Sequence, residues 1–156
     1  MTQSPKAAAG KGRKLSNFLC FAVYSANLAF GRAYQPILDA VGLTYTQYIA
    51  LVALSEADEQ TVSALGEKLF LESNTLTPIL KKLEQMGYIR RRRDPTDERQ
   101  VRVSLTPAGR RLIEKDLGAP LADATGLGDE FPVVQKTVTR LRDNLLRATQ
   151  TKLEKR

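Results

Sequence analysis

The chain has 156 residues, a net charge of +7 and 42% hydrophobic residues, which is typical of one compact soluble domain and excludes intrinsic disorder. It has one cysteine and no histidine, so an internal disulfide, the common zinc sites and Ser-His or Cys-His catalysis are excluded. The excess positive charge favours a polyanionic partner, although charge alone does not separate DNA from RNA or an anionic membrane. We expect no bound metal and no cofactor.

A basic stretch followed by an apolar one, over residues 11–32, has the order of a secretory signal peptide. Ser25 and Asn27 interrupt the apolar stretch, and it is shorter than the roughly 20 apolar residues that cross a membrane. We therefore expect a buried helix in a cytoplasmic protein with no membrane partner. Residues 1–14 are expected to form a basic flexible tail.

The segments after this tail predict helices. Apolar residues surround the whole of the helix from Leu15 to Gly31 instead of forming one stripe, so one small subunit can hardly cover it and a dimer is expected. A loop through residues 34–36 is predicted to lead to a short helix that ends at Gly42. Helical spacing of apolar residues predicts another helix over residues 44–57.

A helix, a turn and a second helix are predicted next. The first is amphipathic and covers residues 61–71, and Ser73 is expected to cap the second, which Gly87 ends. The outward face of the second helix has a short-polar half followed by two cations, which suits a helix in the major groove but is also found on ordinary solvated faces. The expected DNA contacts on this helix are Ser73, Asn74, Thr75, Thr77, Pro78, Lys81 and Lys82.

Two short strands, over residues 88–93 and 100–105, predict a β wing beside that helix, with Asp94-Pro95-Thr96-Asp97 as the turn. Residues 81–102 carry eight Lys or Arg and four Asp or Glu, a local charge of +4 within the total of +7. Cations on a protruding hairpin suit a narrow minor groove, where the negative potential is deepest. The expected wing contacts are Arg91, Arg92, Arg93 and Arg99.

The motif Asp97-Glu98-Arg99, followed by Val103-Ser104-Leu105-Thr106-Pro107-Ala108-Gly109, resembles the MarR family of winged-helix regulators. The resemblance covers nearly the whole chain. It implies a mainly α fold with a small β wing: a winged helix-turn-helix over residues 44–106, and intertwined α-helical dimerisation regions over residues 15–43 and 107–156. It further implies that Asp97 braces Arg99 in the minor groove and that a homodimer binds a pseudopalindromic operator in double-stranded DNA.

Within that family the chain looks like the organic hydroperoxide regulators known as OhrR. The shared motifs are Leu19-Cys20-Phe21, Tyr24, Tyr34, Pro36, Leu38-Asp39, Thr44-Tyr45, Gln47-Tyr48 and Thr75-Leu76-Thr77-Pro78. By that resemblance Cys20 is the peroxidatic thiol, and Tyr34 and Tyr45, from the same or the partner subunit, hydrogen-bond its thiolate. The sensor pocket for organic hydroperoxides would consist of Phe18, Phe21, Tyr24 and Phe30.

The chemistry of such a site is consistent with a switch. A thiolate is the nucleophile that attacks peroxide oxygen, and two phenol donors in an apolar pocket stabilise the anion. The sulfenic acid that results is larger and no longer accepts those hydrogen bonds as a thiolate does. A shift of the dimer helices would then disturb two recognition helices that must lie about 34 Å apart on DNA.

Residues 124–128, where some members of this branch carry a second cysteine, have none. Oxidised Cys20 must therefore react with a low-molecular-weight thiol, condense with a backbone nitrogen or be overoxidised. Two other functions stay open: a regulator that binds a small ligand non-covalently, with Cys20 structural, and a thiol peroxidase, which would lack a resolving cysteine and a nearby arginine or histidine. The sequence favours a peroxide-sensing DNA-binding repressor that is not an enzyme.

Overall fold

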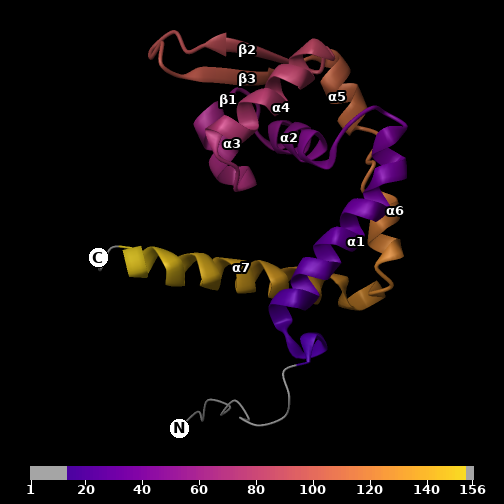
Figure 1. Cartoon of the computed structure of the whole chain (residues 1–156). Coiled ribbons are helices and arrows are strands. Elements are labelled where there is room, and N and C mark those ends of the chain that lie inside the picture. The colour runs from indigo at the N-terminus through magenta and orange to yellow at the C-terminus, as the bar shows by residue number, and fades with distance from the viewer. Residues whose placement is uncertain (1–13, 154–156) are drawn as a thin grey trace. The chain divides into compact units, whose positions relative to one another are not determined.

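Two units divide the chain, residues 1–45 and residues 46–156. The computed structural model describes residues 14–153, so the tail predicted over residues 1–14 lies outside it except for Lys14. Most of the described chain is helical, and its only sheet has three short strands (Figure 1). The predicted fold class, mainly α with a small β wing, is confirmed.

The first unit consists of one long helix and its flanking turns. After a single 3-10 turn, η1 (Leu15–Asn17), helix α1 runs over Leu19–Asp39, and Gly42 has a φ of 70° in the turn that follows. The predicted loop over residues 34–36 and the separate short helix are wrong, because Pro36 lies inside α1. Proline has no amide donor, so the bond that residue 36 would make to the Arg32 carbonyl oxygen is lost, and α1 runs on for only three residues beyond it.

The second unit begins with the winged helix. Its elements are α2 (Tyr45–Glu56), β1 (Gln60–Thr61), α3 (Val62–Leu69), α4 (Ser73–Gln85), β2 (Ile89–Arg93), β3 (Val101–Leu105) and α5 (Pro107–Ile113). Strand β3 lies between β1 and β2 and is antiparallel to both, with Arg91 paired to Val103. Strand β1 was not predicted, because two residues are too few to show an alternation of apolar and polar side chains.

The core of the winged helix is apolar and closed within one chain. Its largest fully buried side chains are Leu51, Leu54, Leu65, Leu76, Leu80, Leu83, Ile89 and Val103. Thr106 caps the amino terminus of α5, and its Oγ1 accepts a hydrogen bond from the Gly109 amide at 3.1 Å. A Cβ atom on Gly109 would overlap the Tyr88 carbonyl oxygen, so the close approach of α5 to the wing requires glycine there.

The carboxyl-terminal part of this unit is helical. Helix α6 (Ala119–Ala124) and a 3-10 turn, η2 (Gly128–Glu130), lead to α7 (Phe131–Leu153), which lies in the region predicted as α-helical over residues 107–156. Several large apolar side chains of α7 are exposed: Val133, Val138, Leu145 and Leu146. In the part of the chain that the structure describes, no helix is long and apolar enough to cross a membrane.

Candidate DNA-binding surface and cysteine site

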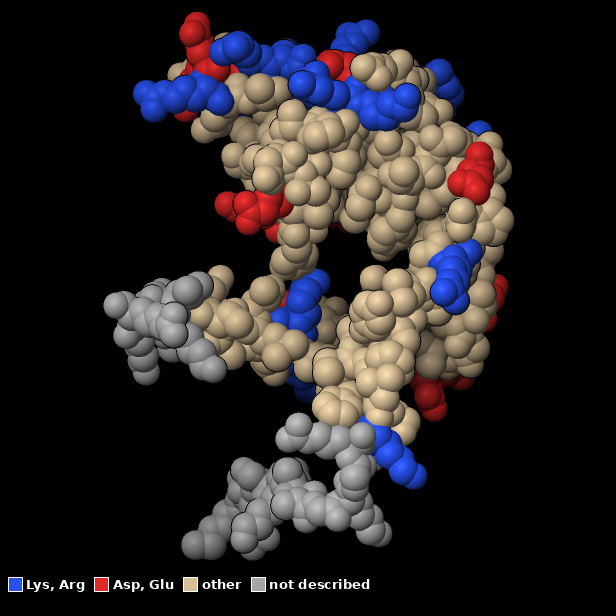
Figure 2. Space-filling view, in the orientation of Figure 1, with Lys and Arg blue, Asp and Glu red and all other residues tan. Residues whose placement is uncertain are grey.

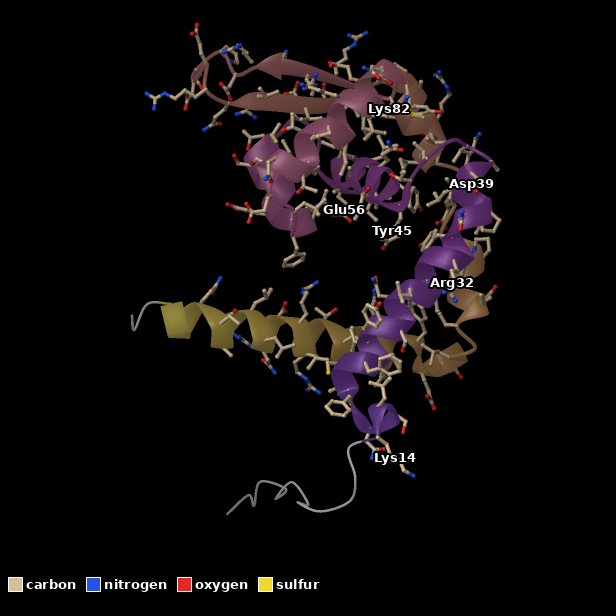
Figure 3. The ribbon with its side chains drawn as sticks, viewed as in Figure 1. Lys14, Arg32, Asp39, Tyr45, Glu56 and Lys82 are labelled. Atoms are coloured by element: carbon tan, nitrogen blue, oxygen red, sulfur yellow. The ribbon has the colours of Figure 1, made fainter. Side chains whose placement is uncertain are left out.

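Helix α4 packs one face into the winged-helix core and leaves the other to solvent. Leu76, Leu80 and Leu83 are buried, and Lys82 lies on α4 near the wing (Figure 3). The exposed positions are Ser73, Asn74, Thr75, Pro78, Lys81 and Lys82. Thr77 is half-buried and its hydroxyl donates to the Ser73 carbonyl oxygen at 2.7 Å. The predicted contact residues of this helix, Thr77 aside, are therefore open to a partner.

The start of α4 differs from the prediction. Glu72 and not Ser73 is the N-cap residue, and no side chain caps this helix. The reason is that Ser73 has already adopted the helical conformation as the first residue of α4, where its hydroxyl does not reach the amides of the next turn. A helix amino terminus carries partial positive charge, so an uncapped one remains open to a phosphate group.

The cations of the wing fall into two groups, paired and unpaired. Arg91 donates its backbone amide to Glu84 Oε1 at 2.8 Å, and its Nε and Nη2 to Glu84 Oε2 at 3.0 and 2.8 Å. Arg92 forms an ion pair of 2.7 Å with Glu59, and Arg93 donates to the Glu98 carbonyl oxygen at 3.1 Å. Arg91 thus joins β2 to α4, and its predicted DNA contact would require it to leave a half-buried carboxylate.

A second set of cations is unpaired. Within residues 14–153, no ion pair involves Lys81, Lys82, Arg90, Arg99 or Arg111. Lys and Arg side chains gather over the wing and the adjacent part of the winged helix (Figure 2). Unpaired, exposed cations are available to neutralise phosphate charge, which is the main source of affinity for nucleic acid.

Asp94 closes the turn of the wing. It is 3% exposed and accepts hydrogen bonds from the Thr96 hydroxyl at 2.6 Å, the Thr96 amide at 2.8 Å and Arg102 Nε at 2.5 Å. These bonds, with the Thr96 hydroxyl first, hold the pKa of Asp94 far below its usual range. The sequence analysis places Asp94 in this turn, where an Asp two positions before a Thr is a turn signal, but it did not predict the contact with Arg102.

Asp97, the predicted brace, contacts Arg99 differently from the prediction. Its Oδ1 accepts the backbone amide of Arg99 at 3.1 Å, and within the described residues no ion pair joins the two side chains. The carboxylate that does hold an arginine in this hairpin is Asp94, with Arg102. A brace of Arg99 by Asp97 therefore stays a prediction for the DNA-bound protein.

The single cysteine lies in the unit over residues 1–45, at the start of helix α1. Cys20 is the second residue of α1 and is exposed. Of the four residues predicted to form the sensor pocket, Phe21 is half-buried, and Phe18, Tyr24 and Phe30 are exposed. The rings of Phe21 and Tyr24 lie 6.3 Å apart. In a single subunit, therefore, the thiol and most of these rings are uncovered.

The two predicted tyrosine donors lie near each other but far from the thiol of their own chain. The Tyr34 and Tyr45 ring centroids are 5.0 Å apart. Cys20 and Tyr34 belong to one continuous helix, fourteen positions apart, which at about 1.5 Å per residue is roughly 21 Å. Asp39 marks the carboxyl end of this helix and Lys14 lies shortly before its amino end (Figure 3). Within one subunit neither hydroxyl of this pair reaches Cys20.

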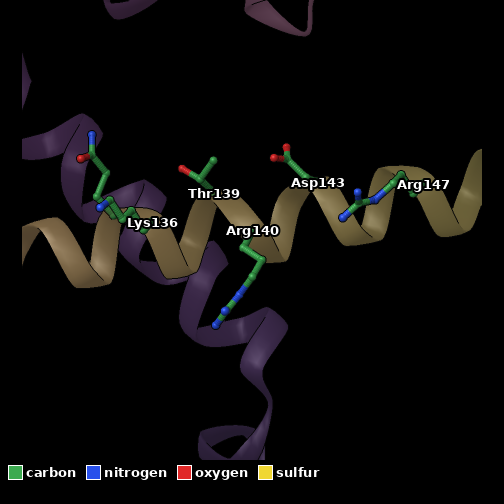
Figure 4. Close-up of a pocket in the computed structure, with 6 residues that line it drawn as sticks. Lys136, Thr139, Arg140, Asp143 and Arg147 are labelled. Carbon is green, nitrogen blue, oxygen red and sulfur yellow. The ribbon is translucent and has the colours of Figure 1, made fainter.

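A shallow polar hollow lies on α7 (Figure 4). Its volume is about 300 Å³, and the residues that line it come from this one helix: Gln135, Lys136, Thr139, Arg140, Asp143 and Arg147. A hollow on one helix face does not enclose a small molecule, so it is a poor candidate for a ligand site. In the described segment, no group of His, Cys, Asp or Glu is arranged to hold a metal ion.

The winged helix with its basic hairpin defines a DNA-binding regulator, and known proteins agree. The family described as transcriptional regulator SarA/Rot matches residues 32–115. The HTH-type transcriptional regulator TtmR of Methylorubrum extorquens is 45% identical over 145 residues, which is 90% of this chain and 74% of that protein. The organic hydroperoxide resistance transcriptional regulator of Bacillus subtilis is 47% identical over 107 residues, 69% of this chain and 73% of that protein.

Solved structures of AbfR are similar as well. AbfR of Staphylococcus epidermidis has a TM-score of 0.73 and 32% identity, with 85% of this chain and 94% of that chain covered. At the same coverage, reduced AbfR bound to DNA has a TM-score of 0.70 and 37% identity, and overoxidized AbfR bound to DNA has 0.69 and 36%. Disulfide-formed AbfR has 0.62 and 36%, with 85% and 92% covered.

The chain therefore belongs to the winged-helix transcriptional regulators of the SarA/Rot and MarR type. Its relatives are named as regulators and not as enzymes, as the sequence predicts. The resemblance to the MarR family and its OhrR branch is confirmed at this level.

Proposed function

We propose that this regulator is a repressor that binds a pseudopalindromic operator as a homodimer and releases it when an organic hydroperoxide oxidises Cys20. The observation that carries the proposal is an exposed thiol in the first turn of a helix whose aromatic neighbours are uncovered. The 47% identity to a regulator of organic hydroperoxide resistance supports the choice of oxidant.

Exposed apolar side chains support the homodimer. On α1 they include Leu19, Val23, Tyr24, Leu28 and Phe30, and on α7 Val138, Leu145 and Leu146. Apolar residues in such number on two long helices mark a surface that a partner covers, because water contact with this area is unfavourable. A second copy of the chain brings the same two helices and is the simplest partner.

The position of the tyrosines supports a site shared between subunits. Because about 21 Å of helix separate Cys20 from Tyr34 in one chain, the hydroxyls of Tyr34 and Tyr45 would have to come from the other subunit. In a dimer in which the two α1 helices run side by side in opposite directions, the thiol of each meets the tyrosine pair of its partner. Hydrogen bonds from two phenols to a thiolate favour the anion.

The oxidation itself requires only the thiolate and the oxidant. The Cys20 sulfur attacks the terminal oxygen of the hydroperoxide, the O–O bond breaks, and the departing alkoxide takes up a proton to leave as an alcohol. Cys20 becomes a sulfenic acid, oxidised by two electrons, and the hydroperoxide is reduced by two. A low-molecular-weight thiol then displaces water from the sulfenic acid and forms a mixed disulfide.

We infer that the protein leaves the operator chiefly when Cys20 carries a mixed disulfide, and less so when Cys20 carries only added oxygen atoms. AbfR is bound to DNA both reduced and overoxidized, so overoxidation is compatible with DNA binding in that protein. A thiol adduct at Cys20 is larger than a sulfinic or sulfonic acid. It therefore displaces more of the aromatic neighbourhood and of the helix that it stands on.

Mixed dimers test the shared site. A subunit with Cys20→Ser is paired, through two affinity tags, with a subunit that carries Tyr34→Phe and Tyr45→Phe. This dimer has one complete site if the tyrosines act across subunits, and none if they act within a subunit. We expect its single thiol to react with cumene hydroperoxide at the wild-type rate. The Tyr34→Phe/Tyr45→Phe homodimer should react about a hundredfold more slowly, since each of the two lost hydrogen bonds to the anion contributes roughly 1.5 kcal/mol.

The matched control for this experiment is Tyr88→Phe, which removes a tyrosine hydroxyl in the winged helix and is expected to leave the rate unchanged. If the mixed dimer reacts as slowly as the tyrosine-deficient homodimer, the tyrosine hydroxyls do not act on the Cys20 thiol of the other subunit, and the shared site is rejected. Intact-mass measurement after peroxide and thiol identifies the product, and the absence of any adduct or oxygen on Cys20 would reject the thiol as the sensor.

A further inference from the structure

Phe70 occupies a position in the helix-turn-helix that does not suit an aromatic residue. It ends α3 with a φ of 57° and a ψ of 36°, a left-handed conformation in which bulky side chains are uncommon. Glycine or asparagine is the usual residue at such a helix end. Because the ring is 58% exposed, burial in the core does not account for it.

The ring of Phe70 has a partner on α7. The guanidinium carbon of Arg142 lies 4.7 Å from the ring centroid, within the range of a cation–π contact. Asp143 Oδ1 accepts from Arg142 Nε at 2.9 Å and lies 2.8 Å from its Nη2, so both groups hold the guanidinium in place. This contact joins the turn that precedes the recognition helix to the helix that carries the exposed apolar stripe.

We propose that the Phe70–Arg142 contact is a latch that fixes the recognition helix relative to α7, and that both residues are positioning residues for operator binding. The proposal rests on the operator binding proposed above and not on peroxide sensing. Helix α4 begins three residues after Phe70. A displacement of α7 is thereby passed to α4, and in a dimer the two latches set the distance between the two recognition helices.

The consequence is a preference for one spacing of the half-sites. Two recognition helices must meet major grooves about one DNA turn, or ~34 Å, apart. A rigid connection on each side penalises a duplex whose half-sites are displaced by one base pair, whereas a loose connection tolerates it. Loss of the latch therefore lowers affinity for the native spacing more than for altered spacings.

The experiment uses the reduced full-length protein in fluorescence anisotropy on its operator and on the same duplex with one base pair added or removed between half-sites. For Phe70→Asn and for Arg142→Gln we expect binding at the native spacing to weaken about tenfold, since a dimer carries two such contacts. Binding at altered spacings is expected to stay within about twofold of wild type. The double variant is expected to resemble either single variant, because both remove one interaction.

Two controls separate the latch from general effects. Arg140→Gln removes a cation from the same helix without touching Phe70 and is expected to keep the spacing preference. Asparagine tolerates the left-handed conformation, so Phe70→Asn is expected to unfold at the wild-type temperature or above, and Phe70→Trp to retain the preference.

Equal loss of affinity at all spacings, or wild-type behaviour of both variants, would overturn the latch. Additive effects in the double variant would also overturn it. If the wild-type protein binds no duplex from its own upstream region, operator binding fails and the latch fails with it. If the wild type binds but peroxide has no effect, peroxide sensing fails and the latch stands.

Discussion

The winged helix and helix α1 bury their apolar side chains to opposite extents. In the winged helix, Leu51, Leu80 and six other large side chains are fully buried within a single chain. In the 21-residue helix α1, Leu38 is the only buried residue, while aromatic side chains such as Phe30 are exposed. The difference teaches that the apolar core of the winged helix is closed within one subunit, whereas α1 leaves an apolar surface that the proposed second subunit would cover.

Removing a core side chain from the complete region is expected to have the largest effect. Leu80→Ala leaves a cavity between α4 and the rest of the winged helix and should lower the free energy of unfolding by about 3 kcal/mol. Urea denaturation followed by circular dichroism measures it. A loss below about 1 kcal/mol would mean that this core is loosely packed and that the contrast with α1 is overstated.

The same logic applied to α7 predicts an effect on assembly and not on folding of the winged helix. Leu145→Asp places a charge in the exposed apolar stripe and should weaken the dimer by roughly 2 kcal/mol, or about thirtyfold. Light scattering coupled to size exclusion at several concentrations measures the dissociation. Thr139→Asp, on the polar face of the same helix, is the control, and equal effects of both variants would argue against a dimer formed by the stripe.

Within the winged helix, we expect the unpaired cations to contribute to operator binding and the paired cations to contribute to the stability of the fold. Arg99→Ala removes an unpaired cation and should weaken operator binding by about 1 kcal/mol and lower the salt slope by about 1, with unchanged thermal stability. Arg91→Ala breaks the contact with Glu84 and should instead lower the melting temperature. Titrations at three salt concentrations with thermal scans compare them. Reversed phenotypes would exchange the two roles.

The smallest expected effect is an acid sensitivity confined to the winged helix. Hydrogen bonds from Arg91, first from its backbone amide, lower the pKa of Glu84, and those from Thr96 lower the pKa of Asp94. A carboxyl group with a lowered pKa stabilises the fold above its unfolded pKa near 4, and this contribution is lost as the pH falls through that value and below. Melting temperatures between about pH 6 and pH 3 should fall less steeply for Asp94→Asn than for wild type. Parallel curves would show that Asp94 does not contribute.

The sequence predicted an element correctly where a local pattern of residues is compatible with only one kind of structure. The apolar stripe of α4, the strands of the wing and the stretch from Thr106 to Gly109 each correspond to an observed element. It failed at Pro36, where the helix continues through a residue that usually ends one, and at β1, which exists only because β3 lies beside it. The pairing of Arg91 with Glu84, seven positions apart and on different elements, depends on tertiary packing that no local pattern encodes.

The sequence motifs propose the residues of the candidate cysteine site but not their arrangement. The motifs single out Cys20, Tyr34 and Tyr45, and only the continuity of α1 reveals that one subunit cannot bring the first two together. Phe70 was predicted to lie inside the amphipathic helix over residues 61–71, and no local pattern shows that the helix ends there with Phe70 in a left-handed conformation.

One measurement tests the central claim most directly. Fluorescence anisotropy of the reduced protein on DNA from its own upstream region is recorded before and after an equimolar organic hydroperoxide, with and without a low-molecular-weight thiol, for wild type and Cys20→Ser. The account predicts tight binding by both proteins when reduced, and release of the wild type alone, most completely when the thiol is present. Release of Cys20→Ser by peroxide, or wild-type binding that peroxide and thiol leave untouched, would contradict it and favour a regulator that responds to a non-covalent ligand.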